Sequence, residues 1–225
     1  FNIADRLADR GNEVLLVDLD QQGNATEGVG LEDAYESEPH LGNVLDGDDP
    51  TTMSDVVRNA HGFDVLPAHA DLDEVADSIR NNSFGELWVR RRVVEPALDG
   101  PYDYAVLDSP PNLGPLADAS LIASQNVVVP LRMSEPSVSG FERMYNQQIV
   151  PIRKEIDLEL LAIVPNALSG DNEERRIIGD LEDSEFGEYL PPFGRSRHFD
   201  EPESPGPGIR ERIAFRRAWR EGQPL

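Results

Sequence analysis

The sequence predicts an α/β protein with a mostly parallel, twisted sheet and helices on its faces. Short apolar runs that are typical of strands alternate with helix-like segments along the 225 residues. Several of these runs end abruptly in polar residues, which places side chains at the carboxyl ends of strands, where open α/β sheets carry their chemistry. The hydrophobic content of 39% is sufficient for a sizeable core, so we expect one domain over residues 1–225.

The order of the predicted elements follows from apolar spacing and turn residues. Residues 2–9 are expected to form the end of a helix that Gly11 closes. We predict strands at 13–18, 63–67, 104–108, 126–130 and 158–164. We predict helices at 41–45, 72–98 with a break near 81–83, 116–123, 136–155 and 171–181. The segment 191–208 is rich in Pro, Gly and acidic residues, and we expect a surface insertion there.

The chain is strongly acidic, with 43 acidic and 20 basic residues and a formal net charge of -23. Periodic apolar strands argue against a disordered acidic protein. We therefore interpret the charge as that of a halophile's protein, because dense carboxylates keep a surface hydrated while concentrated salt screens their repulsion. The absence of cysteine excludes disulfides and cysteine-held iron–sulfur clusters supplied by this chain. No apolar run is long enough to cross a bilayer and no signal pattern opens the chain, so we expect a cytoplasmic location.

Residues 14–26, Val-Leu-Leu-Val-Asp-Leu-Asp-Gln-Gln-Gly-Asn-Ala-Thr, are the most informative stretch. An apolar strand ends in two aspartates and a Gly/Asn turn. Asp18 and Asp20 lie two residues apart, so both side chains leave the same face of an extended strand. We interpret Asp18 as a structural hydrogen-bond acceptor. Asp20 is the catalytic candidate of the pair, because it lies just beyond the carboxyl end of the strand, where open α/β sheets carry their chemistry.

A second apolar strand, 104–108, ends in Asp108 and is followed by Ser-Pro-Pro, which cannot continue a hydrogen-bonded ladder. A carboxylate at this position could hold Mg²⁺, usually through water. The alternative is an aspartate that merely caps the next helix. Asn166 is expected to follow the strand at 158–164, where it is either a turn residue or a group whose amide offers one donor and one acceptor to a ligand.

These motifs resemble the ParA-type chromosome and plasmid partition ATPases of the ParA/MinD superfamily, which are P-loop NTPases with a deviant Walker A motif. Residues 17–26 resemble the family's V-D-x-D-P-Q-G-N-A-T segment, with Gln21 at the usual proline. Residues 107–111 resemble L-D-[AST]-P-P, and residues 65–67 fit L-I-P. Residues 209–225 resemble I-P-x-x-V-x-x-x-x-A-x-x-x-G-K-P-I, with Arg210 at the usual proline.

The resemblance implies a P-loop NTPase-like fold and the cofactors ATP and Mg²⁺. It implies that Asp20 orients the attacking water, that Asp108 binds magnesium and that Asn166 and Arg210 lie at the nucleotide base. It further implies nonspecific DNA binding by Arg212, Arg216, Arg217 and Arg220. The alternative for these arginines is a solvated segment paired with its own glutamates. Membrane binding is not expected, because the apolar residues between them form no clean stripe.

The family's phosphate loop, a Gly-rich turn with G-K-T, is not among these residues, and we expect it with the first strand upstream of Phe1. The family's last helix is expected beyond Leu225. Loss of a central strand leaves neighbouring strands unpaired. We therefore expect residues 1–225 alone to fold poorly and to be inactive.

The function implied is that of an ATP-dependent partition ATPase, cytoplasmic and associated with the nucleoid. Such a protein forms a homodimer with ATP, binds DNA nonspecifically and is released when a ParB-like partner stimulates hydrolysis. Two alternatives stay open: a Min-type cell-positioning ATPase on the membrane, and a non-hydrolysing ParA-like scaffold. A phosphate loop of the form K-G-G-x-G-K-T would favour an ATPase over a scaffold.

Overall fold

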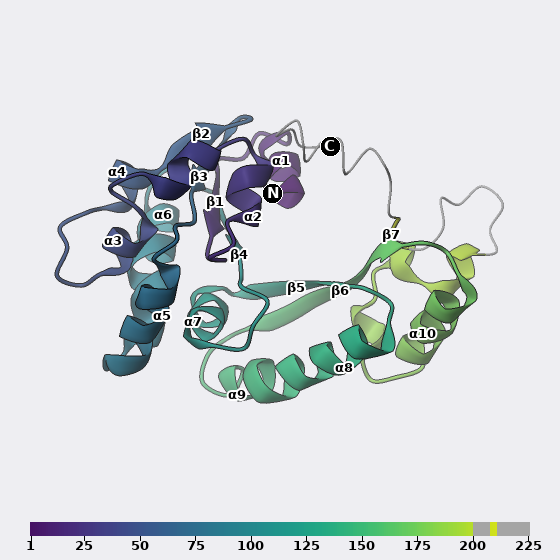
Figure 1. Ribbon diagram of the computed structural model, residues 1–225. Helices are drawn as coiled ribbons and strands as arrows, with labels where there is room; N and C mark the ends of the chain where they lie inside the picture. The colour runs from purple at the N-terminus through teal and green to yellow at the C-terminus, as the bar shows by residue number, and fades with distance from the viewer. Residues whose placement is uncertain (200–207, 211–225) are drawn as a thin grey trace. The chain divides into compact units, whose positions relative to one another are not determined.

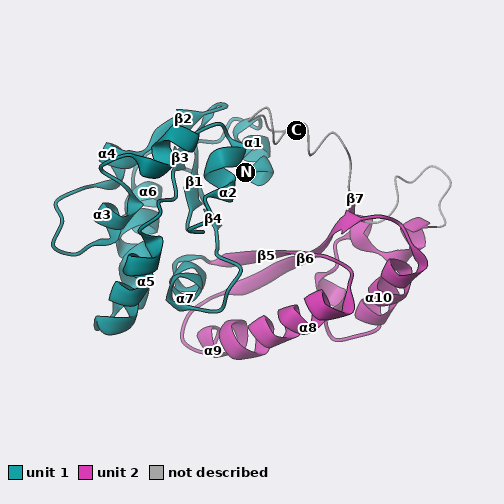
Figure 2. Ribbon diagram, in the orientation of Figure 1, with its two compact units in different colours: residues 1–124, 214–225 teal, residues 125–213 magenta. Residues whose placement is uncertain are grey.

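The computed structural model describes residues 1–199 and 208–210 of the chain. They form two compact units, residues 1–124 and the described residues from 125 onward (Figure 2). Each unit carries parallel strands with helices packed against them, which is the predicted α/β class (Figure 1). The expectation of a single domain stays a prediction.

The sheet of the first unit has the strand order β2-β3-β1-β4. Its core strands β1 (Val14–Asp18), β3 (Phe63–Leu66) and β4 (Tyr104–Asp108) are parallel and were all predicted. Strand β2 (Arg58–Ala60) is antiparallel to β3 and was not predicted. The register places Asp18 opposite Asp108, so the two strands end in aspartates that lie side by side at the carboxyl-terminal end of the sheet.

Helices cover both faces of this sheet because β1 is apolar on both of its faces. Leu15 and Val17 pack in one cluster with α3 (Leu41–Leu45), α5 (Leu72–Asn81), α6 (Glu95–Asp99) and α7 (Pro115–Ala123). Val14 and Leu16 pack in another cluster with α1 (Asn2–Ala8) and α2 (Asn24–Gly28). The predicted break near 81–83 is confirmed, since α5 ends at Asn81 and the chain resumes helical turns at Gly85–Leu87 and Arg90–Val94 before α6. The short helices α2 and α4 (Met53–Val56) were not predicted.

The second unit holds the parallel strands β5 (Asn126–Leu131), β6 (Glu159–Leu168) and β7 (Ile209–Arg210). Helices α8 (Glu135–Met144) and α10 (Asn172–Glu182) share its apolar core with β6. Helix α10 begins at a capping box, in which the Asp171 carboxylate accepts a hydrogen bond from the Glu174 N–H at 2.9 Å. Its residues Ile177, Ile178 and Leu181 are buried, and the helix itself was predicted at 171–181.

Two predictions in the second unit needed new bounds. The helix expected at 136–155 runs without a gap from Glu135 to Ile152, as α8, a π-helical turn at Tyr145–Ile149 and α9 (Val150–Ile152). Strand β6 continues beyond residue 164 because β7 pairs with its carboxyl end. The surface insertion expected at 191–208 stays a prediction; its described part has 3-10 turns at Pro192–Gly194 and Ser196–Phe199, and residues 200–207 lie outside the described residues.

Candidate functional site

Asp18 is the centre of a buried hydrogen-bond network. Thr26 donates its N–H and its hydroxyl to Asp18 Oδ2, each at 2.8 Å, and Asp20 N–H donates to Oδ1 at 3.2 Å. The Thr26 hydroxyl oxygen in turn accepts the N–H of Ala68 at 2.9 Å. Burial raises the pKa of Asp18 to about 6, because lost hydration outweighs the stabilisation of the carboxylate by Thr26. Asp18 therefore acts as the structural acceptor that the sequence suggested.

Asp20 opens the tight turn that follows β1. Its carbonyl oxygen accepts the N–H of Gly23 at 2.9 Å, and its Oδ1 accepts the N–H of Gln22 at 3.0 Å. Aspartate at the first position and glycine at the fourth are typical of a type I turn. Among the described residues, no hydrogen bond reaches the second carboxylate oxygen, Oδ2. The turn thus holds one oxygen of Asp20 and leaves the other available.

Asp108 ends β4 beside this turn. Its carbonyl oxygen accepts the N–H of Leu19 at 2.9 Å, which extends the β1–β4 ladder to the residue before Asp20. Burial raises the pKa of Asp108, and the negative charge of Asp20 raises it further. A bound cation would favour the ionised form of Asp108 and would reduce its repulsion with Asp20. The two predicted carboxylates therefore form an environment that suits a metal ion.

A cavity of about 220 Å³ lies beside Asp20. It is bounded by the two predicted motifs and by α5 and the start of α7, with the lining residues Leu19–Gln22, Asp73, Ala76, Pro110–Asn112 and Gly114–Ala117. The turn after β1 and the Pro-Pro loop after β4 therefore enclose one space. This agrees with the expectation that chemistry gathers at the carboxyl ends of neighbouring parallel strands.

The other predicted residues lie in the second unit or outside the described part of the chain. Pairing of β6 with β7 brings Asn166 and Arg210 close together, with Asn166 opposite Ile209 and Leu168 opposite Arg210. Asn166 lies within β6 and does not follow it, which corrects the expectation. Among the described residues Arg210 Nε is buried without a hydrogen-bond partner. Four predicted DNA-binding residues lie outside the described residues: Arg212, Arg216, Arg217 and Arg220.

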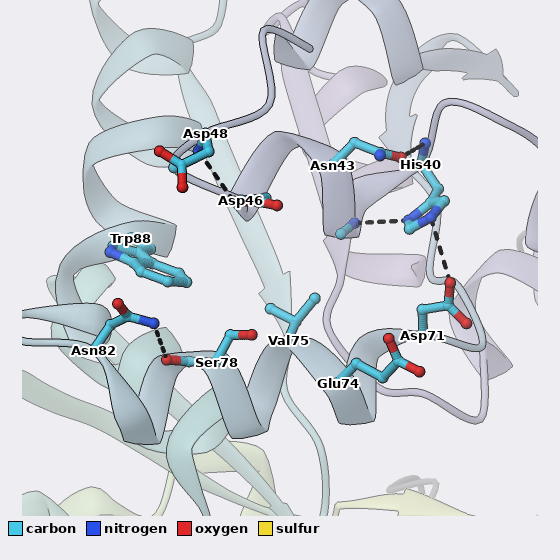
Figure 3. Close-up of a pocket in the computed structure, with 12 residues that line it drawn as sticks. His40, Asn43, Asp46, Asp48, Asp71, Glu74, Val75, Ser78, Asn82 and Trp88 are labelled. Carbon is cyan, nitrogen blue, oxygen red and sulfur yellow. Dashed lines mark hydrogen bonds and ion pairs between the residues drawn. The ribbon is translucent and has the colours of Figure 1, made fainter.

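A larger cavity of about 400 Å³ in the first unit was not foreseen from the sequence (Figure 3). His40 and Asp71 lie at one end of it, and Trp88 forms part of its wall. Near it, Glu38, His40 and His69 bring three potential ligand atoms within 4.8 Å of one another, and no ion is present. These residues therefore have to be considered as a metal site.

The hydrogen bonds of the two histidines argue against a metal ion. His40 Nδ1 accepts the N–H of Gly42 at 3.0 Å, and His69 Nδ1 accepts the N–H of Asp71 at 3.1 Å. Each neutral ring then carries its proton on Nε2, so neither keeps a free lone pair. The rings also stack in parallel, 3.7 Å between centroids and 3° between planes, so their nitrogens do not converge on one point. The pair fits a helix cap and a stacking contact better than ligation.

Comparison with known proteins places this fold and site in a family. Residues 1–161 match the family model AAA_31, which is described as an AAA domain. The chromosome partitioning protein ParA of Caulobacter vibrioides is 32% identical over 144 residues, which are 64% of this chain and 54% of that protein. The chain belongs to the AAA_31 family, and it is a ParA-type member. The match of the ParA-type chain spans about half the length of this relative.

Solved structures share the fold of this chain. Cobyrinic acid a,c-diamide synthase from Mycobacterium smegmatis, with bound ADP and magnesium, is 28% identical to the ParA-type chain, with a TM-score of 0.73. The match covers 98% of the ParA-type chain and 83% of the synthase chain. Apo McdA from Cyanothece is 20% identical with a TM-score of 0.80, over 100% and 84% of the two chains, and supports the fold alone. None of the helices in the described ranges is both long and apolar enough to span a membrane.

Proposed function

We propose that the protein is a ParA-type partition ATPase that binds ATP and Mg²⁺ and hydrolyses ATP. The observation that carries this proposal is the cavity beside Asp20, which the turn after β1 and the Pro-Pro loop after β4 share. Two relatives support it. One is named a chromosome partitioning protein, and another was solved with ADP and magnesium.

The residues of the first unit divide the chemistry between them. Asp108 would hold Mg²⁺ through coordinated water, and the bound ion would neutralise charge on the phosphates. The raised pKa of Asp108 fits this role, because a nearby cation would favour its ionised form. Asp20 would accept a hydrogen bond from the attacking water and hold it in line, since its Oδ2 is available. Asp18 is not a candidate, because both of its oxygens are engaged within the fold.

The second unit supplies candidates for recognition of the nucleotide base. The Asn166 amide offers one donor and one acceptor group, which matches the adenine edge. Arg210 lies on the neighbouring strand, and its buried Nε lacks a partner among the described residues. We assign both residues to the base, with a structural role in the β6–β7 pair as the alternative.

The remaining parts of the proposal concern partners. Arg212, Arg216, Arg217 and Arg220 would bind DNA phosphates without sequence preference, which suits a nucleoid-associated cytoplasmic protein. The ATP-bound protein would be a homodimer that a ParB-like partner releases. Residues 1–225 contain a single lysine, Lys154, and no G-K-T loop, so we expect them to be inactive when assayed alone.

The test is ATP turnover by the complete protein with Mg²⁺, with and without DNA. We expect Asp20→Ala to lower kcat by at least about 100-fold while ATP binding persists, because general-base positioning is worth that much or more. The control is Asp77→Ala, which removes an exposed carboxylate paired with Arg80 on α5. If folded wild-type protein fails to hydrolyse ATP, the scaffold alternative replaces this proposal.

A further inference from the structure

The turn that carries Asp20 is held by two contacts outside the turn itself. Gln21 donates its side-chain N–H to the carbonyl oxygen of Ala70 at 2.9 Å. The backbone carbonyl oxygen of Gln21 accepts the hydroxyl of Tyr35 at 2.6 Å. Gln21 directly follows Asp20, so both bonds restrain the residue next to the carboxylate, one through its side chain and one through its carbonyl group.

Tyr35 also packs against the other end of the same turn. Gly23 adopts φ +62°, and a Cβ atom built on it would lie 2.8 Å and 2.9 Å from Cδ2 and Cε2 of the Tyr35 ring. A side chain at position 23 would therefore clash with the ring as well as strain the backbone. Tyr35 lies in a 3-10 helix at Glu32–Glu36 and packs against the apolar core of the first unit, and this packing restricts the motion of its ring.

The Tyr35 hydroxyl is a reliable donor. Burial raises its pKa, and the carboxylates of Asp18 and Asp20 raise it further. The phenol therefore keeps its proton beside these negative charges and continues to donate to Gln21.

We propose that Gln21 and Tyr35 are positioning residues that fix the Asp20 turn for hydrolysis. The inference rests on the proposed role of Asp20. Gln21 occupies the second position of the β-turn that the Asp20–Gly23 hydrogen bond closes, where proline is favoured in type I and type II turns because its ring presets φ. In this chain two hydrogen bonds supply the restraint that a proline ring would supply covalently. Among the described residues the Gln21 N–H donates to no acceptor, so proline would remove no bond there.

The test compares Tyr35→Phe, Gln21→Ala and the double variant Tyr35→Phe/Gln21→Pro in the complete protein. Each single variant removes one restraint, and we expect kcat to fall about fivefold, the effect of one net hydrogen bond, with KM for ATP unchanged. We expect proline to restore kcat in the Tyr35→Phe background. The control is Tyr104→Phe, which removes the hydroxyl of an exposed tyrosine at the other end of β4.

Amide hydrogen exchange over residues 19–25 gives a readout that does not depend on activity. Exchange is expected to accelerate about fivefold in both single variants and to return to the wild-type rate with proline. An unchanged exchange rate, a change in KM without one in kcat, or a failure of proline to restore kcat would overturn the inference. If the variants change the exchange rate as expected but the wild-type protein never hydrolyses ATP, the proposed function is refuted. The turn is then restrained as inferred, but it does not serve catalysis.

Discussion

At the scale of single residues, the site depends on a threonine that the sequence did not single out. Thr26 donates twice to Asp18 and accepts the N–H of Ala68, a residue 42 positions away. All of these groups are buried, so none can exchange its partner for water. Thr26 thus connects the end of β1 to the segment after β3 and supports the turn that carries Asp20.

Thr26→Val tests this network. Valine keeps the shape but leaves the Asp18 carboxylate and the Ala68 N–H each short of a partner, so we expect the free energy of unfolding to fall by about 2–3 kcal/mol. Chemical denaturation measures the loss. Thr26→Ser keeps the hydroxyl and should lose less than about 1 kcal/mol. Equal stability of the valine and serine variants would contradict the network's importance.

At the scale of elements, long apolar strands were predictable and short paired ones were not. Residues 14–18 and 104–108 contain apolar runs that end in aspartate, so both the strands and the shared edge of Asp20 and Asp108 followed from the sequence. Strands β2 and β7 have only three and two residues, and their conformation comes from the partner strand. Tyr35 was missed because its acceptor, the Gln21 carbonyl, is a backbone group 14 residues away. Its only signal is that it is the one Phe, Trp or Tyr residue in the acidic stretch 31–50.

Helix α3 begins with a histidine cap, which makes this element sensitive to pH. The Nδ1 atom of His40 accepts the Gly42 N–H, and burial and the adjacent His69 lower the pKa of His40. Glu38, Asp71 and Asp49 oppose this shift but do not reverse it. A lowered pKa means that the folded state binds the proton less well than the unfolded chain. The stabilisation is therefore present above the unfolded pKa of 6.5 and is lost as pH falls through the lower folded pKa.

His40→Asn isolates this effect, because asparagine is a good cap that does not titrate in this range. Between about pH 8 and about pH 5 we expect wild type to lose about 1 kcal/mol of unfolding free energy relative to the variant, the value of a cap. Urea denaturation at each pH measures the difference. A constant difference across the range would show that His40 does not titrate with folding.

At the scale of the whole molecule, the net charge of -23 governs the response to salt. Like charges repel within the compact chain, and salt shortens the range of that repulsion from about 10 Å at 0.1 M to about 3 Å at 1 M. The acidic surface therefore bears on stability and solubility more than on the reaction.

The melting temperature should rise with potassium chloride. We expect an increase of at least about 4 °C on moving from about 0.1 M to about 1 M, or about 1–2 kcal/mol for a chain of this size. Calorimetry on the complete protein measures it. Screening saturates once the Debye length is short, so a steady linear rise continuing well past 1 M would identify exclusion of salt from the surface as the cause.

Strand β4 carries a further consequence. In the described part of the chain it pairs with β1 on one side only, and Tyr104 on it is 46% exposed. When residues 1–225 are studied by themselves, this edge can template aggregation between copies, because it has apolar side chains and no lysine, proline or bulge, whereas the strand expected upstream would cover it in the complete protein. The negative charge opposes such contact at low ionic strength, because approaching copies repel each other. Concentrated salt that stabilises the folded chain would remove this barrier, so for residues 1–225 studied by themselves the conditions of greatest stability and of greatest solubility differ.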